Sequence, residues 1–446
     1  MNLFRSVADY ATLVHRRNRW SRRRLEAYQL EAVRSLLARA VRDSPFYRNL
    51  YGGRVPASLE EFRTFPTIDK ATMMASFDAL NTAGLSLADA SAWAMAKERN
   101  KDWLGYYRDR YVVGLSSGTS GNRGIYVTPR ELTERLPAVF LARGGVPLSL
   151  LPFRILFLLR VFSQGFSDIS SPLIHLSYLG TMEPAERIVA EADRLRVNVL
   201  MAPPSLLRTL LPLVGRLRTR VRLVVTYAEV LEDEEKSRLE RAFGCRVVQI
   251  YQASEGQMGS PCREGTLHVN EDLVYVELYD AAGRPVTGPG PAAASMVVTN
   301  LVNEVQPLIR YRMNDLVELG PPCPCGSSFR TIRRVLGRND DVLYLMGADG
   351  SLRPLFPDLV ARWIITEDAT VREFRVEQAD ARTLSVRLDM LPGADGVAAA
   401  SAVRARVESE LAALGLAAVV SVETGPLVLP AEMHKYRRFV RRFPAP

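Results

Sequence analysis

The sequence has few cysteines and no long apolar run. Four cysteines in 446 residues are too few for a disulfide framework, so we expect them to be thiols or metal ligands in a reducing compartment. The apolar stretch 146–162 is interrupted by Arg154, Arg160 and two prolines, whereas a bilayer-spanning helix needs about 20 apolar residues. No secretory signal is evident among the first residues. The sequence thus predicts a cytoplasmic protein without a transmembrane segment.

Acidic residues are fewer than basic ones, 49 against 58, which gives a formal net charge of +9. Part of this excess is concentrated around Trp20, in Arg16, Arg17, Arg19, Arg22, Arg23 and Arg24. The simplest interpretation is a row of solvated arginines on a helix face. A docking surface for a carrier protein or a membrane is the alternative. We expect no nucleic-acid partner.

The length predicts two or three structural units. Apolar residues at helical spacing predict a helix from Arg23 that stops at Ser44-Pro45. Beyond it, helical stretches (183–195 and 232–243) alternate with continuous apolar runs, which predict parallel strands buried on both faces. These runs are 111–115, 154–159, 197–201, 221–227 and 245–251.

The pattern changes twice towards the C-terminus. After Leu273, short alternating segments separated by Gly/Pro turns predict a small β-rich lobe. After Gly337, we expect a hairpin at 348–350 and a helix over 397–414. The predicted fold is therefore α/β, with a helical lead-in (1–52), a large domain of mainly parallel sheet flanked by helices (53–337), and a small mobile α+β lid (338–446).

A Ser/Thr/Gly-rich loop follows the apolar run 111–115. Its hydroxyl groups, and backbone N–H groups made accessible by glycine, are suited to bind phosphate oxygens. An ordinary polar loop is the structural alternative, and the spacing is not that of a Walker loop. The candidate phosphate-binding residues are Ser116, Ser117, Gly118, Thr119, Ser120, Gly121 and Arg123.

Five segments in order resemble the motifs of the adenylate-forming acyl ligases. They are SSGTSGNRG at 116–124, YQASE at 251–255, YRMND at 311–315, GRNDD at 337–341 and HKYRR at 434–438. SPFY at 44–47, FPTIDK at 65–70 and YAEVL at 227–231 narrow the resemblance to the phenylacetate-CoA ligase-like branch. The resemblance covers nearly the whole chain.

The resemblance implies roles for residues in these segments. The 116–123 loop would hold the β- and γ-phosphates of ATP, Ser254 would lie near the α-phosphate, and Glu255 would bind Mg²⁺. Asp315 would accept the ribose hydroxyls and Arg338 would reach ribose or phosphate. Tyr251 would stack on adenine, with Ala228 and Glu229 along its edge. Lys435 would bring positive charge to the reacting carboxylate when the lid closes, with Asp340 as the hinge.

One position departs from the family pattern. Asn122-Arg123 stands where the family usually has a lysine after the second glycine of the loop. Arg123 is a candidate substitute phosphate contact.

A second set of residues has the chemistry of a metal site. Cys262, His268, Cys323 and Cys325 provide three thiols and an imidazole, a complete tetrahedral set for structural Zn²⁺. The Cys-Pro-Cys-Gly turn favours this interpretation, and some members of the resembled branch carry a comparable cluster. The alternative is three unrelated cysteines and a surface histidine.

Two further residues are interpreted as structural. Cys245 lies in an apolar run and is expected to be a buried core thiol. His175 is expected to be a core histidine, with a place in the acyl pocket as the alternative.

The resemblance implies ATP-dependent conversion of a carboxylic acid, aromatic or small, to acyl-AMP, followed by acyl transfer to CoA. Adenylation without thioester formation, or transfer to an acyl carrier protein, is the enzymatic alternative. A non-catalytic nucleotide-binding scaffold is the alternative of another class. The sequence does not identify the acid, and it leaves homodimer formation open.

Overall fold

The computed structural model describes residues 3–100, 102, 104–115, 124–159, 164–181, 183–338, 341–368, 370–427 and 437–443. Its N-terminal part is helical: α1 (Leu3–Arg19), α2 (Arg22–Asp43), α3 (Pro45–Tyr51), α4 (Leu59–Phe62), α5 (Lys70–Ala75), α6 (Phe77–Leu80) and α7 (Leu87–Arg99). Ser44 caps α3, because its hydroxyl accepts a hydrogen bond from the Tyr47 amide while Pro45 occupies the first turn. The predicted helix stop is confirmed, whereas α1 was not predicted.

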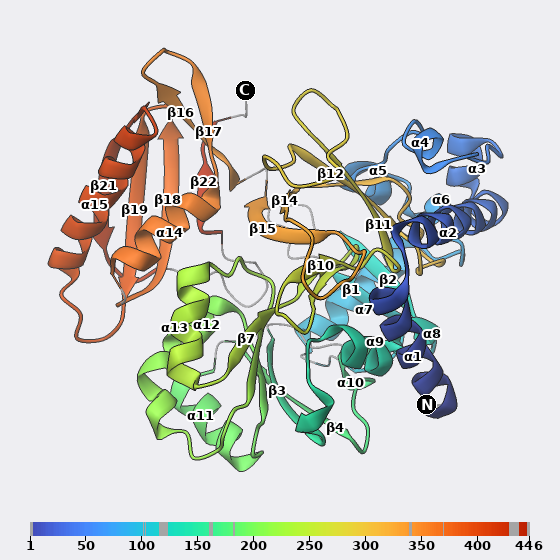
Figure 1. The fold of residues 1–446 in the computed structure, drawn as a ribbon, viewed down its shortest axis with the longest axis horizontal. Coiled ribbons are helices and arrows are strands. Elements are labelled where there is room, and N and C mark those ends of the chain that lie inside the picture. The colour runs from blue at the N-terminus through green and yellow to red at the C-terminus, as the bar shows by residue number, and fades with distance from the viewer. Residues whose placement is uncertain are drawn as a thin grey trace.

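A five-stranded parallel sheet with helices on both faces has the strand order β4-β3-β5-β6-β7. Leu156 and Leu158 of β3 pack with α11, α12 and α13, whereas Ile155 and Phe157 pack on the face of α9 and α10 (Figure 1). Burial on both faces explains the continuous apolar runs. The strands are β3 (Phe153–Leu159), β4 (Ile174–Gly180), β5 (Val199–Met201), β6 (Leu223–Thr226) and β7 (Arg246–Gln249).

Helices connect and cover these strands. They are α8 (Arg130–Thr133), α9 (Leu136–Arg143), α10 (Gln164–Ser167), α11 (Ala185–Arg194), α12 (Pro204–Leu210) and α13 (Asp233–Phe243), with 3₁₀ turns at Leu148–Leu150 and Leu211–Arg216. Among the helices described, none is both long and apolar enough to cross a bilayer.

Antiparallel strands form the rest of the body, in sheets β14-β15-β10-β9-β8, β11-β12-β13 and β1-β2. Run 111–115 is strand β1, but its predicted parallel pairing is wrong because it pairs antiparallel with β2. The segment that joins them, 116–124, is shorter than the dozen or so residues of a parallel crossover. The strands are β1 (Tyr111–Leu115), β2 (Ile125–Pro129), β8 (Tyr251–Ala253), β9 (Gly256–Pro261), β10 (Leu267–Val269), β11 (Val274–Tyr279), β12 (Ser295–Asn300), β13 (Tyr311–Met313), β14 (Asp315–Leu319) and β15 (Thr331–Arg338).

The C-terminal elements, orange to red in Figure 1, pack around their own apolar core between Leu343 and Phe439. They form sheets β17-β16-β20 and β21-β19-β18-β22 with two helices. The predicted hairpin joins β16 to β17, and the predicted helix is α15. The elements are β16 (Leu343–Gly347), β17 (Leu352–Leu355), α14 (Pro357–Glu367), β18 (Val371–Asp380), β19 (Thr383–Met390), α15 (Gly396–Ala413), β20 (Leu416–Ala417), β21 (Val419–Thr424) and β22 (Phe439–Arg441). The α/β class is confirmed, and the domain boundaries stay predictions.

Three arginines of the N-terminal run are structural. The Arg16 guanidinium lies 4.5 Å from the centre of the Tyr28 ring, and Arg17 is buried. Arg22 pairs with the buried carboxylate of Glu271 at 2.8 Å. The interpretation as solvated arginines is therefore wrong for these three residues: Arg16 joins α1 to α2, whereas Arg17 and Arg22 fasten these helices to Ser260 and Glu271 of the body.

Two single-residue predictions are corrected. His175 is exposed rather than buried, because it lies on β4 at the edge of the parallel sheet. It is also absent from the lining of the large cleft described below. Cys245 is only partly buried, although it packs against the core on the α11–α13 face, and burial raises the pKa of its thiol to about 11.

Candidate active site and metal centre

A cleft of about 2230 Å³ lies between the parallel sheet, the antiparallel sheets and the C-terminal elements. Open α/β sheets bind ligands at the carboxyl ends of their strands, and the loop after β6 opens into this cleft. Seven of the residues predicted to act on the nucleotide line it: Ala228, Glu229, Tyr251, Ser254, Glu255, Asp315 and Arg338. The predicted residues of the 116–123 loop, Asp340 and Lys435 lie outside the described residues.

Ser254 and Glu255 form the tight turn between β8 and β9. Asn300 holds this turn by donating from Nδ2 to the Glu255 carbonyl at 2.8 Å. The Glu255 carboxylate accepts a 2.6 Å hydrogen bond from the hydroxyl of Tyr126 on β2. Burial raises the pKa of Glu255, and the bond from Tyr126 opposes this rise. Tyr126 therefore favours the charged carboxylate, the form that binds a hard cation.

Tyr126 was not predicted from the sequence, since none of the motifs includes it. Its hydroxyl also lies 3.4 Å from that of Tyr311, the first residue of the YRMND segment. The only available signal was an aromatic residue shortly after the Ser/Thr/Gly-rich loop. Long-range pairing with Glu255, 129 positions away, cannot be read from such a pattern.

Asp315 and Arg338 face each other across the β14–β15 ladder. The Tyr251 hydroxyl donates to Oδ2 of Asp315 at 2.8 Å, and Nε of Arg338 lies 3.9 Å from Oδ1. Three segments that are distant in the sequence thus converge on one carboxylate at the cleft wall. Such an acceptor, held between a phenol and a guanidinium, has the chemistry to bind vicinal hydroxyls.

Ala228 and Glu229 follow the carboxyl end of β6. Ala228 has a left-handed φ of 65°, a conformation that is uncommon for residues with a Cβ and frequently marks functional loops. Glu229 accepts hydrogen bonds from Ser205 and from Arg438, at 3.1 Å. Burial alone would raise its pKa, but Arg438, Arg208 and Ser205 together lower it. A wall of the cleft is thereby joined to the C-terminal elements.

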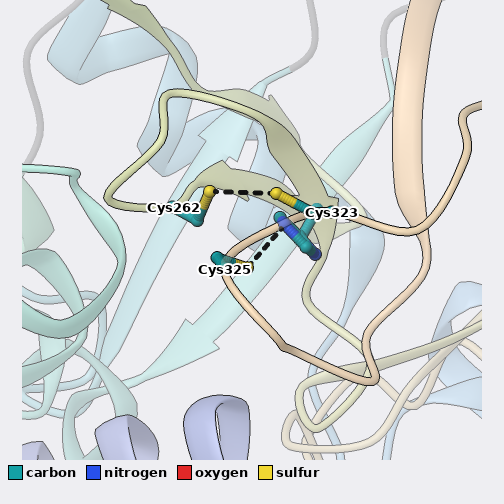
Figure 2. Close-up of side chains that lie close together, drawn as sticks. Cys262, Cys323 and Cys325 are labelled. Carbon is teal, nitrogen blue, oxygen red and sulfur yellow. Dashed lines mark hydrogen bonds between the residues drawn. The ribbon is translucent and has the colours of Figure 1, made fainter.

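The four predicted metal ligands come together (Figure 2). Cys262 Sγ lies 3.7 Å from Cys323 Sγ, and Cys325 Sγ lies 3.5 Å from His268 Nε2. All four ligand atoms lie within 4.8 Å of one another. For tetrahedral zinc with Zn–S near 2.3 Å and Zn–N near 2.0 Å, the expected separations are about 3.8 Å for S···S and 3.5 Å for S···N. The geometry therefore fits zinc.

The surroundings of the cluster also fit a metal. His268 Nδ1 lies 2.9 Å from the Phe329 carbonyl, the outer contact that orients a ligating imidazole. Burial lowers the pKa of His268, which favours the neutral ligand form. Gly326, at φ 80°, allows the turn of the Cys-Pro-Cys-Gly segment, where the Gly326 amide donates to the Cys323 carbonyl at 3.1 Å.

No family model matches the chain. The chain is 28% identical over 215 residues to a phenylacetate-coenzyme A ligase of Aromatoleum evansii, which is 44% of this chain and 46% of that protein. It is 32% identical over 139 residues to a ligase of the same name from Pseudomonas putida, covering 29% and 30% of the two chains. The alignments thus span less than half the length of these curated relatives.

The fold is shared over a greater length. A crystal structure of 2-hydroxyisobutyryl-CoA ligase with 2-HIB-AMP matches with a TM-score of 0.74 and 18% identity, covering 96% of this chain and 91% of that one. The anthranilate-CoA ligase AuaEII with anthranoyl-AMP matches with a TM-score of 0.54 and 16% identity, covering 72% and 65%. The resemblance found in the motifs is confirmed: the chain is homologous to phenylacetate-coenzyme A ligases and has the fold of acyl-CoA ligases of the adenylate-forming superfamily.

Proposed function

We propose that the protein is an AMP-forming ligase that activates a carboxylic acid as acyl-AMP and transfers the acyl group to CoA. The observation that carries the proposal is that Tyr251 and Glu255 of the YQASE segment meet Asp315 of the YRMND segment in one cleft. Homology to phenylacetate-coenzyme A ligases supports the same activity.

In this proposal each part of the cleft acts on one part of ATP. Glu255 holds Mg²⁺, whose charge stabilises the phosphates. The 116–123 loop and Ser254 bind phosphate oxygens, and Arg338 reaches ribose or phosphate. Asp315 accepts the ribose hydroxyls, while Tyr251 and the Ala228–Glu229 segment hold adenine. Lys435 supplies charge to the reacting carboxylate and α-phosphate.

The lid, 338–446, then turns about Asp340 between the two half-reactions. Arg438 contacts Glu229 of the body and Glu373 on β18. Arg362 of α14 similarly pairs with Glu232 at 3.0 Å. These ion pairs support the proposal by providing a polar interface, which separates at lower cost than a large apolar one.

The acid would bind beside an apolar wall of the cleft. Leu159, Phe166, Tyr227 and Ile250 line this part. Phe166 and Tyr227 both pack edge-on against Phe157, at 5.1 Å between ring centres. An aromatic or small apolar acid suits such a wall.

We also propose that Cys262, His268, Cys323 and Cys325 hold a structural Zn²⁺. Four protein ligands leave no open position for water or substrate, so the metal would stabilise the fold rather than react. A cytoplasmic location, where CoA and ATP are supplied and thiols stay reduced, completes the proposal.

Pyrophosphate release from ATP, measured with a panel of acids, tests the activity. Acid-dependent release that yields a thioester with CoA supports the proposal. Pyrophosphate release in which the acyl group is transferred only to an acyl carrier protein, or in which acyl-AMP is the end product, would favour the enzymatic alternatives. Nucleotide binding without release under any condition would favour a non-catalytic scaffold.

A further inference from the structure

We propose that Arg17 is the charge partner of the Cys₃His centre (Cys262, His268, Cys323 and Cys325), so that metal bound there fastens the end of α1 and the α1–α2 corner to the body. The inference depends on the zinc part of the proposed function and is independent of the nucleotide cleft. It assigns a role to a residue that none of the family motifs includes.

Arg17 is a buried cation with no paired carboxylate among the described residues. The residue is only 5% exposed. Nη1 and Nη2 donate to Oγ and the carbonyl of Ser260, at 3.3 and 3.2 Å. Asp272 is the nearby acid, but both of its oxygens accept from Nη2 of Arg143 at 2.8–2.9 Å. Because a buried guanidinium without an anion is destabilising, Arg17 needs another source of negative charge.

The metal centre supplies that charge. Three thiolates and a neutral imidazole on Zn²⁺ give a net charge of −1. Arg17 reaches the centre through β9: Ser260, which accepts both of its hydrogen bonds, pairs with His268 across the β9–β10 ladder and lies two residues before Cys262. Burial and Arg143 lower the pKa of Arg17 to about 10, whereas Cys262, Cys325 and Asp272 oppose this fall. When the metal leaves, the anionic metal centre beside Arg17 is lost.

Hydrogen bonds also connect the centre directly to the helix end. Two serines follow the Cys325-Gly326 turn: Ser327 donates to the Arg17 carbonyl at 2.7 Å, and Ser328 to the Trp20 carbonyl at 2.8 Å. The next residue, Phe329, contacts the His268 ring. One short segment therefore touches metal ligands on one side and the last turn of α1 on the other.

The first half of α1 has an anchor of its own. Asp9 pairs at 3.1 Å with Arg135, the residue just before α9, and Leu13 packs with Val139 of that helix. This contact does not involve the Cys₃His centre. Metal loss is therefore expected to loosen the segment from about residue 14 to residue 24 more than the preceding turns.

Three variants separate the effect of the charge at position 17 from the effect of charge elsewhere in the arginine run. They are Arg17→Gln, Arg17→Lys and Arg23→Gln. Arg23 is exposed in the same arginine run and serves as the control. Zinc transfer to a chromophoric chelator should be at least tenfold faster for Arg17→Gln than for wild type. It should be intermediate for Arg17→Lys and unchanged for Arg23→Gln. A wild-type rate for Arg17→Gln would overturn the assignment.

Hydrogen exchange of the wild-type chain tests the inference without any substitution, so a folding defect in a variant cannot affect the result. After metal is removed and its absence verified by elemental analysis, amide exchange should rise in 14–24 and stay unchanged in α15. Unchanged exchange in 14–24, or protein that neither contains nor takes up zinc, contradicts the inference. Pyrophosphate release measured on the same samples reports the ligase activity separately.

Discussion

The Tyr126 hydroxyl donates a 2.6 Å hydrogen bond to Oε1 of Glu255. The bond joins the strand after the Ser/Thr/Gly-rich loop to the turn of the YQASE segment, and so connects two motifs proposed to bind one nucleotide. The bond involves only one of the two carboxylate oxygens of Glu255. Tyr126 is therefore a positioning residue for the proposed magnesium ligand.

Tyr126→Phe retains the ring and removes this bond. Because a hydrogen bond to a charged group contributes about 1.5–3 kcal/mol, the Mg²⁺ concentration for half-maximal activity should rise about tenfold or more. The melting temperature should change little. Titration of pyrophosphate release with Mg²⁺ checks this, and a wild-type midpoint would show that Tyr126 does not position Glu255.

Glu255→Gln keeps the size of the side chain and removes its charge. The apparent Mg²⁺ requirement should rise steeply while the protein stays folded. In wild type, burial raises the pKa of Glu255, and the carboxylate must be ionised to bind the cation. Magnesium affinity should therefore fall as the pH falls through that raised pKa, and this decline should be absent in the variant. Calorimetric Mg·ATP binding across pH is the measurement.

Glu271→Gln tests the anchoring of the N-terminal helices. Burial alone would raise the pKa of Glu271, but Arg330, Arg22 and the Arg330 amide together lower it. Its stabilising effect is thus present above the ordinary value of about 4.3 and is lost as the pH falls through the lowered pKa. Denaturant unfolding should show that the substitution lowers the free energy of unfolding by about 3–5 kcal/mol at pH 7, and by a smaller amount under acid conditions.

Glu264→Gln is the matched control for Glu271, because Glu264 is exposed and, within the described ranges, pairs only with its neighbour Arg263. The free energy of unfolding of this variant should fall by no more than about 1 kcal/mol. Equal losses for the two variants would contradict the assigned role of Glu271.

Cys323→Ser should lower both zinc content and melting temperature without abolishing nucleotide binding. The reason is that the centre joins the β9–β10 region to the segment before β15, away from the cleft. Elemental analysis of protein never exposed to chelator should give close to one zinc per chain for wild type. Cys245→Ser, which alters a thiol outside the cluster, should leave the zinc content unchanged.

The sequence predicted the features that depend on local chemistry. The apolar runs other than 111–115 contribute strands to the parallel sheet, which is buried on both faces, and the four metal-ligand candidates lie together as their ligand types indicated. Motif positions from Ala228 to Arg338 line one cleft. In each case the residue type or the periodicity carried the information.

The features that were missed depend on tertiary partners. Arg17 and Arg22 look like solvated charges until Ser260 and Glu271 are placed beside them. His175 looks like a core residue until β4 proves to be an edge strand. Tyr126 acquires its role only through Glu255. None of these pairings has a short-range signature, so periodicity and composition could not reveal them.

The central claim is the formation of acyl-AMP by a cleft that uses Lys435 in its first step. Lys435→Ala should reduce acid-dependent pyrophosphate release by at least about 10²-fold, as expected for loss of a preorganised charge used in the transition state. With synthetic acyl-AMP and CoA, the same variant should form thioester at a rate near wild type. Acyl-AMP formation at the wild-type rate in Lys435→Ala would contradict the account.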